Sequence, residues 1–256
     1  MLLVSPSTYI AATSFLAFMG FIFTDILNHY SKAPQDTSPA QVFFELFWLP
    51  VFFMVPLLTM KCLAEERRLG TIETLLTTPV TTTEVVLGKY GAAYLLYLAL
   101  WGSTGGFFYI LKRFSGDLRF LDPGPLLGGY LFIAISGLLF VAIGVFASSL
   151  SRNQAVAGIL CFTMLFGLII GGRFLADAGF LGRDGLRSVK DAIEYAQIFA
   201  HRNDFARGVI DTRQLIFYLS GTVLALIFSI LGVEAKLLHS LLPPLTVSAP
   251  PAGSAR

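Results

Sequence analysis

Long stretches without a charged side chain alternate with short polar stretches along this chain. The charge-free runs are 1–24, 46–60, 90–111, 123–151, 153–172 and 214–233. A helix needs about 20 apolar residues to cross about 30 Å of hydrocarbon, because each residue advances by about 1.5 Å. The runs therefore predict six transmembrane helices, at about 8–27, 42–60, 90–111, 128–150, 154–172 and 214–236.

Two of these runs carry further signals. Pro50 and Pro56 predict a kink in the second span, which lipid tolerates when neighbouring helices satisfy the freed carbonyl groups. The first run resembles a secretory signal peptide in its apolar character. It lacks a basic start and an A-x-A cleavage site, so we expect it to remain as a span.

Composition supports a membrane protein and excludes other classes. Hydrophobic residues make up 55% of the 256 residues, and charged residues only 13%, roughly half the globular average of about 25%. The net charge of +2 provides no extended positive field, which excludes a nucleic-acid-binding protein. Cys62 and Cys161 are far apart in apolar surroundings and are expected to be small buried side chains.

The segment 61–89 is too polar to span a membrane, and its regular pattern of polar, apolar, Gly and Pro residues predicts helices rather than an irregular loop. Residues 61–68 are expected to extend the second helix by about two turns. Gly70 suits the left-handed position that ends a helix. The first half of the segment therefore predicts a helix and a stop.

The second half of the same segment predicts a short helix at 72–77. Thr71 is placed to cap it and Pro79 to end it, while Thr81 and Glu84 form a capping box for a helix that runs into the third span. The result is a helical elbow at one membrane face. The physics alone leaves open whether this elbow transmits force or merely connects two spans.

Three motifs together resemble ABC-2 type permeases, most of all the subfamily of gliding-motility and multicopper-enzyme-maturation permease components. The first is EERRLGTIE at 65–73, followed by LL at 75–76 and PV at 79–80. The others are SP-x-x-YI at 5–10 and F-x-RGVIDTR at 205–213. The resemblance extends over nearly the whole chain.

The resemblance implies an all-α membrane subunit with six spans over 1–242, a cytoplasmic coupling elbow and both termini in the cytoplasm of a bacterium. It would export a substrate across the inner membrane, driven by a separate ABC ATPase that holds the ATP and Mg. A second permease copy or a paralogue would complete the complex, with an extracytoplasmic accessory subunit as a further candidate partner besides lipid. The residues that match the family's coupling loop are Glu65, Glu66, Arg67, Gly70, Thr71, Glu73 and Pro79.

Two features depart from that family pattern. Only four residues precede Ser5, where the family has a longer cytoplasmic segment, so the N-terminus is expected to be truncated or to lack an amphipathic helix. The implied topology also places seven of the 18 Lys and Arg residues in the cytoplasm and eleven outside. The positive-inside rule alone would reverse this orientation.

Motif tests give no support for an enzyme. The Gly88-Lys89 pair lacks the glycine spacing of a P-loop, so ATP hydrolysis is expected on the partner. An intramembrane protease of the Glu-Glu-x-x-x-Arg class would need an Arg where Gly70 stands. A Ser–His dyad needs a buried histidine, and all three histidines are placed at or beyond span ends: His29, His201 and His239.

The sequence also lacks the side chains that metal or proton transport would need. Cys161 and Met164 share one helix face, but five Met in the chain are too few for a copper relay, so core packing is expected. No carboxylate lies in the middle of a span, which argues against a proton-coupled carrier. Asp25 and Glu45 lie near span ends on one membrane face, either solvated or paired with Lys32 or the 173–213 loop.

That loop is expected to form short helices that dip into the outer leaflet and return. Ser188 and Asp191 are placed to cap an amphipathic helix, and Asp211 to cap the sixth span. Resemblance to ABC-2 permeases implies an extracytoplasmic gate, with a tight turn at Gly208 and with charges that pair with Asp204 or Asp211. The matching gate residues are Arg207, Gly208, Asp211 and Arg213.

Two other functions remain open from the sequence. The chain could serve an ABC-type complex that does mechanical or envelope-assembly work without solute flux. It could also be an ATPase-independent structural membrane protein or intramembrane enzyme. The Pro-rich tail, 243–256, is expected to be disordered in each case.

Overall fold

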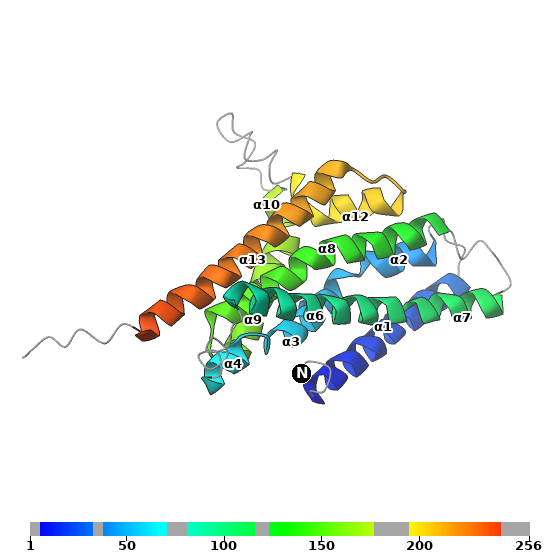
Figure 1. Cartoon of the computed structure of the whole chain (residues 1–256). Coiled ribbons are helices and arrows are strands. Elements are labelled where there is room, and N and C mark those ends of the chain that lie inside the picture. Colours follow the sequence, from blue (N-terminus) through cyan, green and yellow to red (C-terminus); the bar gives the residue numbers. More distant parts are fainter. Residues whose placement is uncertain (1–5, 33–37, 71–80, 116–122, 177–194, 242–256) are drawn as a thin grey trace, which may run out of the picture.

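A computed structural model describes residues 6–32, 38–70, 81–115, 123–176 and 195–241 (Figure 1). All regular elements in these ranges are helices. They are α1 (Pro6–Lys32), α2 (Pro39–Glu45), α3 (Trp48–Thr59), α4 (Ala64–Leu69), α6 (Thr82–Ser103), α7 (Gly105–Ser115), α8 (Pro123–Leu150), α9 (Gln154–Phe166), the π-helix η3 (Gly167–Gly171), α10 (Gly172–Ala176), α12 (Ile198–Ala206) and α13 (Thr212–Leu241).

Six of the described helical stretches are long and apolar enough to cross a membrane. They coincide with the six predicted spans, and most extend a few residues further at their ends. The prediction of an all-α, multi-pass membrane protein is therefore confirmed. The predicted short helix at 72–77, the first part of the amphipathic helix after Ser188 and the Pro-rich tail lie outside the described residues.

Helix α8 lies in the middle of the bundle. It packs against α13, α9, α6, α12, α3 and α2, and 67% of its most apolar stretch is buried, against 22% for the fifth span. Glycines on α8 allow this close packing, because a Cβ at Gly137 would overlap the Tyr97 ring and one at Gly144 would overlap Thr59. Small residues of this kind let helices approach closely in lipid, where no hydrophobic effect draws them together.

The second span differs from its prediction in two places. The helix is interrupted at Leu46 and Phe47, so that α2 and α3 are separate, and this break lies upstream of Pro50. The expected extension of the second span reaches Leu69, but a second break at 60–63 separates α3 from α4 within it. Pro56 stays inside α3, which continues for three residues beyond it.

Two other spans contain irregularities that the sequence did not predict. The third span changes from α6 to α7 at Thr104, whose hydroxyl donates to the Trp101 carbonyl oxygen at 2.6 Å. The fifth span passes through the π-helix η3 before α10. The expected capping box of the third span is confirmed, since the Thr81 hydroxyl accepts from the Glu84 N–H and the Glu84 carboxylate accepts from the Thr81 N–H.

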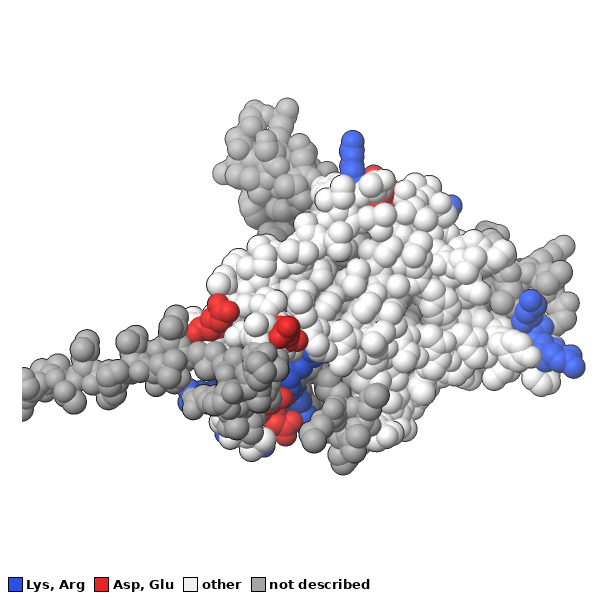
Figure 2. Space-filling model, viewed as in Figure 1, with Lys and Arg blue, Asp and Glu red and all other residues white. Residues whose placement is uncertain are grey.

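The bundle has two ends that differ in their polar groups. We call the end that holds α4, the start of α6 and the end of α8 the α4 end, and the end that holds α2, α12 and the start of α13 the α12 end (Figure 1). On the visible face, charged side chains gather near the ends of the helices and leave the middle of the bundle uncharged (Figure 2). This distribution suits a protein whose middle lies in hydrocarbon.

Candidate functional site

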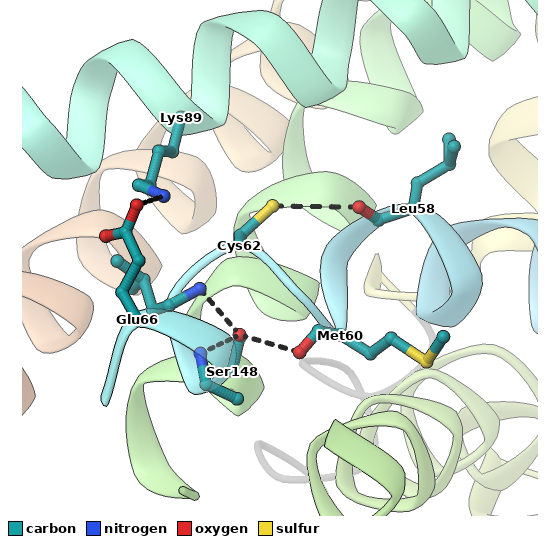
Figure 3. Close-up of polar contacts among 8 residues, drawn as sticks. Leu58, Met60, Cys62, Glu66, Lys89 and Ser148 are labelled. Atoms are coloured by element: carbon teal, nitrogen blue, oxygen red, sulfur yellow. Dashed lines mark hydrogen bonds and ion pairs between the residues drawn. The ribbon is translucent and has the colours of Figure 1, made fainter. Parts of the chain in front are cut away.

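The break between α3 and α4 is made by a serine hydroxyl from another helix. Ser148 Oγ, on α8, accepts from the backbone N–H of Leu63 at 3.0 Å and of Ala64 at 3.1 Å (Figure 3). The same hydroxyl donates to the Met60 carbonyl oxygen at 3.3 Å. In a continuous helix the Ala64 N–H would bond directly to the Met60 carbonyl, so Ser148 is inserted into the helix ladder.

Helix α4 is also tied to α6 by an ion pair. Glu66 on α4 pairs with Lys89 Nζ on α6, and each side chain is 24% exposed (Figure 3). Partial burial makes such a pair less sensitive to salt than a fully exposed one. The pair fixes one side of α4 to the start of the third span.

Arg67 ties α4 to two further helices. Its Nη1 donates to the Ser149 carbonyl oxygen near the end of α8, and its Nη2 donates to the Gly232 carbonyl oxygen of α13 at 3.1 Å. A guanidinium suits this position because it holds several N–H donors in one plane. Together, Ser148, Glu66 and Arg67 clamp α4 onto α6, α8 and α13.

The two thiols lie in the core beneath this clamp. Cys62 and Cys161 are both free and buried, as expected from the sequence. The Thr59 hydroxyl donates to the Val55 carbonyl oxygen at 2.8 Å and lies 3.9 Å from Cys161 Sγ. In the described part of the chain, no group of three or more His, Cys, Asp or Glu side chains could hold a metal.

At the α12 end, His201 is buried between two hydrogen-bond partners. Its Nε2 lies 2.8 Å from the Tyr195 carbonyl oxygen and its Nδ1 lies 3.1 Å from the Tyr218 hydroxyl. The carbonyl only accepts, so Nε2 carries the proton and Nδ1 accepts from Tyr218. Burial lowers the pKa of His201, although the Tyr195 hydrogen bond and the nearby Asp204 and Asp211 oppose this shift.

The neighbouring Arg202 connects α12 to α2. Its Nη2 lies 3.4 Å from Glu45 Oε1. The Arg202 side chain is 8% exposed, whereas the Glu45 side chain is 59% exposed. Of the alternatives that the sequence left open for Glu45, the structure shows a pair with the 173–213 loop, with Arg202 as the partner.

The chain between α12 and α13 turns through a left-handed glycine. Gly208 has a φ of +78°, as the predicted tight turn requires. Asp211 caps α13, since its Oδ1 accepts from the Arg213 N–H at 2.9 Å. The expected pairing of Arg207 and Arg213 with Asp204 or Asp211 is wrong in the described structure, because Asp204 instead accepts from the Gln214 amide at 2.7 Å and both arginines are exposed.

Residues 24–182 match the family described as ABC-2 family transporter protein, which covers more than half of the chain. The chain belongs to the ABC-2 transporter family. No curated protein matches it. Membership supports an ABC transporter permease subunit, and the family implies an ABC-type ATPase partner and a typically dimeric arrangement.

The structure of this ABC-2 protein brings part of the predicted coupling loop together. Glu66 and Arg67 lie on the clamped face of α4 with partners inside the chain, while Glu65 is half-buried beside them. Gly70 ends α4 with a φ of +69°, as predicted. Thr71, Glu73 and Pro79 lie outside the described residues. Direct contact of these residues with an ATPase stays a prediction.

Two residues that matter in this geometry gave no sequence signal. Ser148 looks like one small packing residue among many in a membrane helix, and Arg202 like one of several loop cations. His201 was expected at or beyond a span end, and it is outside the spans, but it is buried. In the described structure its partners are Tyr218 and Tyr195, so it forms no Ser–His dyad.

Proposed function

We propose that the chain is the membrane subunit of an ABC exporter in the bacterial inner membrane, and that a separate ATPase docks on residues 61–89. The observation that carries this proposal is the clamp on α4. The segment expected to contact the ATPase follows α4 directly, and α4 is bonded to three spans at once. A displacement applied to 71–80 would therefore reach α6, α8 and α13 together.

The proposal places the α4 end in the cytoplasm and the α12 end outside. Closure of an ATPase dimer around ATP would move the elbow, and α4 would pass that motion to the bundle. A second permease, identical or paralogous, would complete the pathway. The buried side chains of the bundle are mainly apolar, which suits an amphipathic or lipid-like substrate better than an ion.

Docking is tested by isolating the tagged, full-length protein from its native membrane in mild detergent and identifying bound proteins by mass spectrometry. A P-loop ATPase at equal stoichiometry is expected. Glu73→Arg and Pro79→Ala should reduce its recovery, whereas Asp25→Arg, an exposed change at the opposite end, should not. Normal recovery with both elbow variants, or the absence of any ATPase, would reject the docking proposal.

Transmission through the clamp is tested separately with a charge exchange. At equal amounts of bound ATPase, Glu66→Lys should weaken the coupling of ATP hydrolysis to the permease, because it breaks the link to α6. Adding Lys89→Glu to the same chain should restore the coupling, since the pair is re-formed with reversed charges. A double variant as impaired as the single one would count against transmission by this pair.

A further inference from the structure

Arg202 holds a buried charge that its surroundings compensate only in part. The side chain is 92% buried, yet its Nε is a buried donor without a hydrogen-bond partner among the described residues. Guanidinium groups stay protonated in proteins, so this charge persists despite the burial that lowers its pKa. A buried donor that lacks an acceptor lowers the stability of the folded protein, which makes the arrangement unusual for a purely structural residue.

The geometry of the Glu45 contact leaves half of one guanidinium edge unused. Nε and Nη2 lie on the same edge of an arginine and together match the two oxygens of a carboxylate or phosphate. Glu45 contacts Nη2 alone, at 3.4 Å, beyond the usual 2.7–2.9 Å of a charge-assisted hydrogen bond. Glu45 is also mostly exposed, so water solvates it well and its release needs little rearrangement.

We propose that Arg202 binds the oxyanion of a ligand, a phosphate or carboxylate group. Glu45 contacts Nη2 only while this ligand is absent. The ligand's two oxygens would bond to Nε and Nη2 together. Glu45 is then displaced, and with it the ion pair that joins α2 to α12. An anionic group at the α12 end thus loosens the contact between these two helices.

The surrounding groups favour this assignment for Arg202. The nearby Asp204 is already engaged with Gln214, so it does not compete for the guanidinium. His201 has both ring nitrogens bonded and is not a free donor for the anion. Binding at Arg202 does not require ATPase docking, so a failure of this inference and a failure of the proposed function are distinguishable.

The test measures anion binding to the full chain purified in a neutral sugar-based detergent, by isothermal titration calorimetry. The probes are inorganic phosphate and dodecyl phosphate. Binding of dodecyl phosphate alone indicates an amphipathic ligand, and binding of both indicates that the free anion suffices. Absence of binding by either probe overturns the proposal.

Two variants should change the affinity in opposite directions. Arg202→Gln should weaken binding by about tenfold or more, because both donors of the edge are lost. Glu45→Gln should strengthen binding several-fold, because the competing carboxylate is gone. Lys32→Gln, which removes an exposed cation at the same end, should leave the affinity unchanged.

A structural role for Arg202 makes a different prediction. If Glu45 and Arg202 only hold α2 against α12, Glu45→Gln weakens anion binding or leaves it unchanged. Either result overturns the proposed competition between Glu45 and the anion for Arg202. Should Arg202→Gln fail to fold, Arg202→Lys replaces it, since lysine keeps the charge but loses the paired edge. Unchanged affinity in Arg202→Lys would also contradict the proposal.

Discussion

The guanidinium of Arg67 donates a hydrogen bond of 3.1 Å to the carbonyl oxygen of Gly232, which lies 165 residues further along the chain. This bond joins α4, the first helix of the elbow, to the last span. With the second bond from Arg67 to the Ser149 carbonyl, it links three elements through one side chain. The following variants test how far the architecture depends on such links.

Arg67→Lys should loosen α4 without unfolding the bundle. One ammonium group cannot reach the carbonyls of both Ser149 and Gly232, so about 1–2 kcal/mol of local stability should be lost. Hydrogen exchange of the amides of α4 should become faster. Arg68→Lys, an exposed change on the same helix, is the matched control, and equal exchange in both variants would contradict the clamp.

Ser148→Ala should destabilise the junction between α3 and α4. The N–H groups of Leu63 and Ala64 would lose their buried acceptor, at a cost of about 1–3 kcal/mol. Thermal unfolding in detergent should begin at a lower temperature. Ser136→Ala is the control, because Ser136 bonds only to carbonyls of its own helix, and the idea fails if both variants unfold alike.

Gly144→Ala should destabilise the contact between α8 and α3. The added methyl group would overlap Thr59, which cannot shift freely because its hydroxyl is bonded to Val55. Overpacking of this kind costs about 1–3 kcal/mol. Gly91→Ala on α6 has open space around it and should unfold at the same or a slightly higher temperature. The reverse order of stability would refute the packing described for α8.

Docking of α12 should weaken in acid. The pKa of His201 is lower in the folded protein than in the unfolded chain, so the unfolded chain binds the proton first as the pH falls. The contribution of neutral His201 to the stability of the folded protein is complete above about pH 6.5. It is lost as the pH falls below that value. Hydrogen exchange of α12, corrected for the intrinsic effect of pH, should therefore rise in acid. His201→Gln should remove this pH dependence, and its persistence in that variant would show that His201 is not the titrating group.

The orientation of the bundle is testable by labelling cysteines placed at its two ends. The native thiols Cys62 and Cys161 are buried and should remain unlabelled. In intact cells, a membrane-impermeant thiol reagent should label Lys112→Cys, at the end of α7, but not Thr81→Cys, at the start of α6. Labelling of Thr81→Cys alone would reverse the proposed topology, in agreement with the positive-inside count.

The sequence by itself determined the six spans and the helix ends that depend on local chemistry. Run length decides whether a helix crosses hydrocarbon, and this property needs no knowledge of neighbours. Gly70, Gly208 and Asp211 were likewise placed correctly, because left-handed turns and helix caps involve residues only a few positions apart.

Only the tertiary structure decided where the spans break and which charges are paired. The break after α3 depends on Ser148, which lies 84 residues away from Ala64. The buried Arg202 meets Glu45 across 157 residues. A hydrogen bond inserted into a helix, or a charge held against a distant carboxylate, exists only after the helices pack. Local sequence patterns do not predict such long-range contacts. The clamp on α4 and the burial of Arg202 against Glu45 therefore could not be predicted from the sequence.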